Sequence, residues 1–233
     1  GSVAIVSGAS VEGVSGGIVL GTVGGTYGSG DVAVSSGDAT QRSSGKITMA
    51  TGSSDTVSSG DLVFATGQSS LNAGNVIVTG GDSALEVGGS VMIAGGQGQV
   101  NGGSVSLQAG SGSDVGASGT IDLVSGSSKE GTGGALEIAA GTSALGTGGL
   151  ISLTSGSSYT QGSGSVSIQS AKSVGAGPSG SININTGASA LSDSGSIELI
   201  TGSSAAASAG GFSIVSGTSA TGAGAQVSLR GGD

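Results

Sequence analysis

The side chains of this chain that could do acid–base or metal chemistry are few and of restricted types. Among 233 residues there are 14 Asp and Glu and 5 Lys and Arg, with no His and no Cys. Ser–His and Cys–His nucleophiles and His- or Cys-ligated metal sites are therefore excluded. Paired carboxylates remain, and Asp122, Glu137 and Glu198 recur at one position of a repeated segment. Such a pair could hydrolyse a glycosidic bond, but a solvated face is the simpler interpretation.

Two binding chemistries also need weighing, and neither has a regular array of residues. Calcium-binding Gly/Asp repeats have a nine-residue period, whereas the aspartates here form no column: Asp31, Asp38, Asp61 and Asp82. Ice-binding surfaces need a flat array of threonines, and only three stand at outward strand positions: Thr48, Thr79 and Thr154. We therefore expect no catalytic residues, no cofactor and no metal site, and we predict that the protein is not an enzyme.

The elements that carry these residues are fifteen consecutive repeats, which we call rows. Ten rows have the length of Thr120–Gly134, three short rows have one residue fewer, and two long rows have one more. Positions are numbered from the first residue of each row, and a broken sixteenth row begins at Gln226. A period sustained over the whole chain indicates a repeat architecture. The full rows begin at Ser2, Gly17, Asp31, Lys46, Asp61, Asn75, Ser90, Ser104, Thr120, Ala135, Leu150, Ser165, Ser181, Ser196 and Gly211.

Positions 2 and 4 of every full row hold a sizeable apolar residue, for example Ile121 and Leu123 in the row TIDLVSGSSKEGTGG. A spacing of two places both side chains on one face of a β-strand. Many of these residues are β-branched, which suits a half-buried pleated surface. We predict a short strand over positions 1–6, with positions 2 and 4 in the core.

The rest of the row is constant at a few places and variable elsewhere. Position 6 is always small, position 7 is usually Gly, and the row closes on Gly with one exception, Ala225. Glycine at fixed places indicates backbone with a positive φ or a close approach of two segments. Position 9 is Ser in eleven rows, as at Ser54, Ser128, Ser158 and Ser204, and is smaller still in others, so we expect it to be sterically closed. All variation in length falls after position 9, which predicts a solvent-facing arc.

These features together predict an all-β fold, a parallel β-solenoid or β-helix in which successive rows stack and pair. A coil could hold one row, about 15 residues, or two rows, about 30 residues. We favour two rows per coil, because a one-row coil would turn position 11 inward, and burying unpaired Glu12 or Glu130 is costly. We expect residues 1–233 to form one uncapped solenoid domain, a segment of a longer protein or fibre.

Charge and hydropathy limit the partners. The net charge of −9 and the absence of a basic stripe argue against nucleic acid. No apolar run approaches the roughly 18 residues of a membrane span, so we expect no membrane insertion. Self-association is the expected partnership. A candidate lateral contact face is formed by apolar residues at position 3 in the first half of the chain: Val19, Val63, Ile77 and Met92.

The repeated sequence motif of the rows, as in Ser165–Ser170 and Ser196–Gly210, resembles Gly/Ser-rich repeat tracts of large predicted secreted or surface proteins of microalgae and oomycetes. The resemblance covers the whole chain and implies an extracellular or cell-surface location, but no site residues. We expect a structural, filament-forming protein segment that assembles by end-to-end stacking or lateral contact. The alternative is an adhesive or ligand-binding solenoid that contacts glycan, mineral or ice.

Overall fold

The computed structural model describes residues 1–113 and 116–232, and within these ranges the chain forms no helix and no strand. Residues 114, 115 and 233, which the single-domain prediction included, lie outside the description. The prediction of an all-β parallel solenoid is therefore wrong, as is the preference for two rows per coil that depended on it. The reason lies in the hydrogen bonds, because strands exist only where extended segments pair.

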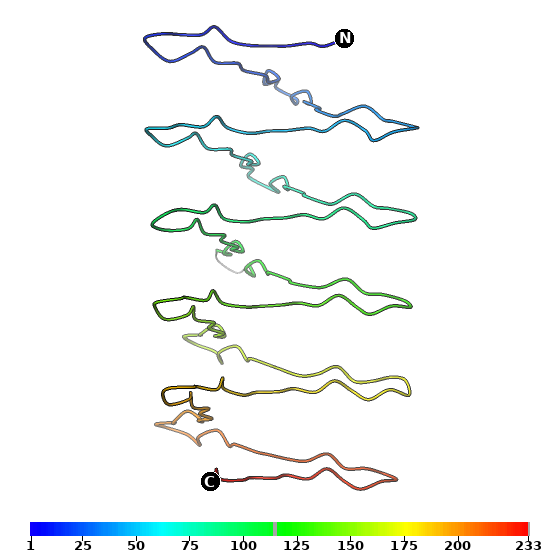
Figure 1. The fold of residues 1–233 in the computed structure, drawn as a ribbon, viewed down its shortest axis with the longest axis vertical. Coiled ribbons are helices and arrows are strands. Elements are labelled where there is room, and N and C mark those ends of the chain that lie inside the picture. The colour runs from blue at the N-terminus through cyan, green and yellow to red at the C-terminus, as the bar shows by residue number, and fades with distance from the viewer. Residues whose placement is uncertain (114–115, 233) are drawn as a thin grey trace. The chain divides into compact units, whose positions relative to one another are not determined.

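The chain divides into two units, Gly1–Ile121 and Asp122–Asp233. The same local pattern fills both: extended stretches alternate with tight loops, as can be followed along each unit in Figure 1. Positions 1–6 of every full row, which lie outside the bends and carry neither helix nor strand, belong to these stretches. The period-two apolar residues are therefore not sufficient by themselves to produce a sheet.

Fourteen of the fifteen full rows bend once after position 9, and the row that begins at Ser104 is described only in part. In rows of the common length the bend covers three residues, as at 55–57, 144–146 and 205–207. In the three short rows it covers two, at 26–27, 70–71 and 99–100. The long row that begins at Ser165 bends one position later, at 175–177. Variation in row length is thus absorbed at the bend, as the sequence predicts, and the extended stretches keep a constant length.

In eight of the full rows a backbone hydrogen bond closes the loop that follows the extended stretch. The amide of the closing residue donates to the carbonyl of the residue at position 7, as from Gly134 to Gly126 and from Gly149 to Gly141, both at 2.9 Å. Ala225, the one closing residue that is not glycine, makes the same bond to Gly217. Among the described residues every hydrogen bond joins two residues of one row. No bond between described residues connects one row with another.

No core forms from the residues described. The side chains at positions 2 and 4, predicted to be the core, are all exposed. A few residues are half-buried, and all but one stand at position 6: Gly80, Ala109, Ala140, Ser155 and Ser216, with Ser173 at position 9. The packing within these ranges is therefore local, at the base of each loop.

Candidate functional site

The most extensive feature of the surface is the set of apolar side chains at positions 2 and 4, which we call the apolar stripe. Apart from Val3, the exposed fraction at position 2 of the full rows ranges from 49% at Ile182 to 60% at Phe212. On the opposite side of the same stretches, at position 3, the candidate lateral face is more exposed, from 75% at Val63 to 96% at Val19. At position 4, on the same side as position 2, the exposed fraction reaches 79% at Leu20 and overlaps that of position 3, so only position 2 is distinctly less exposed and neither side is buried.

The candidate lateral face is exposed to solvent, as the apolar stripe is. Val19, Val63, Ile77 and Met92 all lie in the first unit and are all exposed. In the second unit position 3 is largely polar or acidic, with Asp122 and Glu137 as examples. The stripe, in contrast, continues through every full row of both units, so it is the larger of the two apolar surfaces.

In some rows the base of the loop explains the closing glycine, whereas at Gly60 and Gly210 an added Cβ would meet nothing within 4 Å. A Cβ added at Gly149 would lie 3.2 Å from the Cβ of Ala140, which occupies position 6. The same contact would be 3.3 Å between Gly134 and Ser125. These separations are tighter than ordinary van der Waals contact, so a small residue at position 6 and glycine at the end fit together. Of the described glycines only Gly28 has a positive φ, at 152°. At position 7 the expectation of a positive φ or a close approach is wrong, because a Cβ added to glycines such as Gly126 and Gly141 would meet nothing within 4 Å.

The serines at position 9 have a role that the sequence argument missed. In ten of the eleven rows with this serine, its Oγ accepts a hydrogen bond from a backbone amide two or three residues later, at 2.8–3.3 Å. Each of these ten serines is exposed rather than closed, and it holds the bend. Ser173, the eleventh, is half-buried. The preference of serine for such local bonds is a signal that the sequence does contain.

Three rows have glycine at position 9, and there the loop is arranged differently. A Cβ added at Gly25 would overlap the carbonyl oxygen of Gly28, and one added at Gly98 would overlap that of Asn101. At Gly112 the carbonyl oxygens of Gly116 and Ala117 would be met at 2.7 and 2.9 Å. Because a carbonyl of the loop occupies the space of the side chain, serine would not fit without rearrangement.

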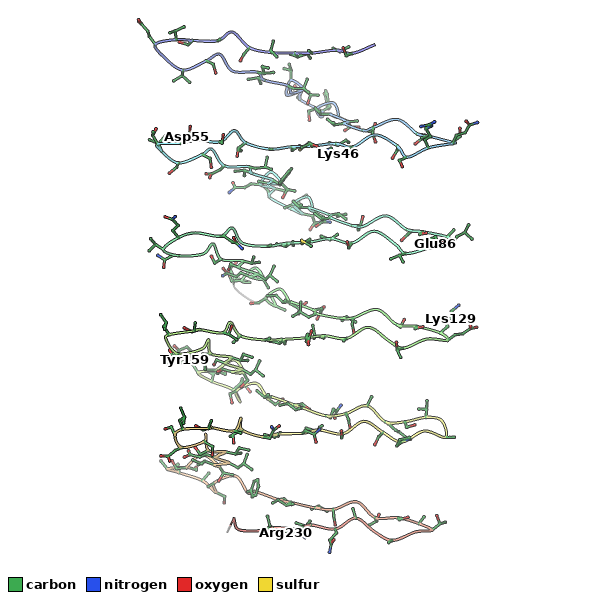
Figure 2. All side chains as sticks on the ribbon, viewed as in Figure 1. Lys46, Asp55, Glu86, Lys129, Tyr159 and Arg230 are labelled. Atoms are coloured by element: carbon green, nitrogen blue, oxygen red, sulfur yellow. The ribbon has the colours of Figure 1, made fainter. Side chains whose placement is uncertain are left out.

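The charged residues do not gather into a site. Asp55, Glu86, Lys129 and Tyr159 project from loop bends, whereas Lys46 and Arg230 stand on extended stretches (Figure 2). The sequence-predicted carboxylates Asp122, Glu137 and Glu198 are all exposed. Within the described ranges there is no group of three carboxylates that could hold a metal ion, and no pocket.

No protein-family model, no curated protein and no solved structure matches this chain. The described part of the chain forms no helix with the length and hydropathy needed to cross a bilayer. Functional inference therefore depends on the geometry of the rows. That geometry offers two recurrent features, the exposed apolar stripe and the closed loop.

Proposed function

We propose that this protein is a structural, non-catalytic repeat protein that associates with further copies of itself. The observation that carries the proposal is the exposure of the apolar stripe along every full row. Exposed apolar surface beyond a few hundred Å² marks an interaction surface in a soluble protein. Here the accessible surface of the chain is 23034 Å² for a mass of 21.1 kDa.

That area can be compared with what a compact chain of the same mass exposes. The scaling of folded monomers gives about 9,000 Å², and a fully extended chain gives about 31,000 Å². The chain therefore exposes roughly 14,000 Å² more than a compact monomer would. Since 35% of the residues are hydrophobic, the hydrophobic effect strongly favours removing this surface from water. Association is the route by which the apolar side chains leave water.

The setting we propose is extracellular or at the cell surface, in a filament or coat. Its support is the resemblance of the rows to Gly/Ser-rich tracts of secreted proteins. The low content of charged residues, 8%, also suits a material whose rows lie against one another. Immunogold labelling of sectioned source cells tests the location: label confined to the cell interior would contradict it.

Association is tested by sedimentation velocity and electron microscopy of the purified chain over a range of concentrations. We expect particles or filaments much larger than 21.1 kDa. Ile47→Ser, which removes one apolar side chain of the stripe, should raise the concentration needed for assembly several-fold. Thr48→Ser on the opposite side of the same stretch is the matched control and should leave it unchanged. A wild-type chain that stays monomeric at every concentration would refute the proposal.

A further inference from the structure

In the extended stretches that the structure describes, the apolar side chains are not covered and the backbone does not pair with another row. Their apolar stripe is exposed, and the described backbone bonds all lie within loops, so the described amides and carbonyls of positions 1–6 pair with no other row. A folded chain ordinarily makes about one hydrogen bond per residue. Extended segments with unpaired edges are templates for pairing with another chain. One partner can satisfy both needs only if it is itself extended and apolar on one side.

We infer that this partner is a further copy of the same chain, whose extended stretches interleave with these row by row along both units. The inference rests on the proposed function and adds the mode of contact. A partner must present an extended stretch and an apolar stripe once per row, over fifteen rows. A second copy does so by construction. Because the loops absorb the differences in row length, the stretches of successive rows also remain alike in length.

The extent of the exposed surface also favours interleaving over docking at one patch. In a standard protein–protein interface each partner buries about 800 Å². The excess surface of this chain is more than ten times that area. The stripe is exposed in both units, and Ile47 in the first unit and Ile151 in the second are each 50% exposed. A contact limited to the lateral face would leave the stripe of the second unit bare.

Backbone hydrogen exchange on the purified, assembled full chain tests the inference without any mutation. We expect the amides of positions 1–6 in rows of both units to exchange at least 100-fold more slowly in the assembly than in the dispersed chain. The loop amides after position 9 should change much less. An assembly in which the stretches exchange as fast as in the dispersed chain would overturn the inference while leaving self-association intact.

Variants separate the stripe from the lateral face. Ile47→Ser and Ile151→Ser should each weaken assembly several-fold, whereas Ile77→Ser and Met92→Ser should not. The opposite result would assign assembly to the lateral face and overturn interleaving. Single-cysteine variants add a direct readout, because the chain has no Cys of its own. Ser152→Cys should form disulfides between copies under mild oxidation, since paired stretches bring Cα atoms within the roughly 4–7 Å that a disulfide spans.

One further outcome concerns the chain alone. A monomer whose stretches are protected from exchange would mean that the chain covers its own stripe, and it would overturn both this inference and the proposed function. A monomer whose stretches exchange freely would refute the proposed function and, with it, the interleaving. The failures of the two proposals are therefore distinguishable.

Discussion

The hydrogen bond from the backbone amide of Gln161 to Ser158 offers a sensitive test of how the loops are held. The two atoms are 3.0 Å apart, and both residues are exposed. A solvent-exposed bond of this kind contributes about 0.5–1 kcal/mol, because the open form bonds to water instead. Ser158→Ala removes the acceptor and nothing else of size. The open fraction of the loop should therefore rise roughly two- to five-fold, the factor that this free energy represents.

The assay is amide exchange at Gln161, measured by NMR on a chain that carries ¹⁵N only in glutamine. Neither substituted residue is adjacent to Gln161, so a change in its exchange rate reports opening of the loop. Ser157→Ala is the matched control, because Ser157 precedes Ser158 and makes no side-chain hydrogen bond among the described residues. Ser158→Thr retains a hydroxyl and should retain most of the protection. Equal effects of Ser158→Ala and Ser157→Ala on Gln161 would refute the assignment of the serine as the group that holds the bend.

Three other predictions concern the loops and the charge. Gly98→Ser, although it installs the commonest residue at this position, should disorder its loop, which would appear as faster amide exchange over residues 99–103. Gly149→Val should break the bond to Gly141 and open its loop, with loss of protection at the amide of residue 149. Gly60→Val, in a row without this closing bond and with nothing within 4 Å of the added Cβ, should leave amide exchange in its loop unchanged. Raising the salt concentration should lower the concentration needed for assembly, measured by light scattering, because copies of net charge −9 repel one another.

The local part of the architecture could be predicted from the sequence with some accuracy. Rows beginning at residues such as Thr120 and Ala135 correspond to extended stretches followed by one bend, and differences in row length fall where the sequence places them. These features depend on contacts within a single row, such as the fit of Gly134 against Ser125. The sequence contains both members of each such pair at a nearly fixed spacing, so their meeting can be anticipated.

The non-local part was predicted wrongly, and the reason is physical. A period-two pattern such as Ile121 and Leu123 indicates that one side of an extended stretch tends to be buried. It does not state whether the covering stretch belongs to the next row or to another molecule, because similar rows make equally good partners in either case. The prediction of a solenoid assigned all pairing to the same chain, and the structure contains no bond between rows among its described residues.

Residues at position 9 are small, as the sequence shows, but steric closure is not the reason in most rows. Small residues there suggested steric closure, but Ser128 and Ser158 are exposed and accept bonds from amides three residues later. Steric closure does occur, at Gly25 and Gly98, where a carbonyl takes the place of the side chain. Serine and glycine therefore occur at one position for different reasons, a hydrogen bond in one case and a close approach in the other. Row length separates the two cases only in part, since Gly25 and Gly98 stand in short rows but so does Ser69.

The loops and the stretches thus divide the physical tasks of the chain. The loops satisfy part of their own backbone through the position-7 carbonyl and the position-9 hydroxyl, and they can form in a single copy because their contacts are local. The stretches cannot satisfy theirs alone, because an extended backbone has no internal hydrogen bonds to make. Before such a chain meets a partner, its loops are already formed, while the amides and carbonyls of its extended stretches are still free to pair. The conformational entropy lost on association is smaller when part of the chain is already ordered. Replacing Ser158 and the position-9 serines of other rows with Ala weakens the loops. This multiple variant should assemble more slowly, even though no extended stretch is altered.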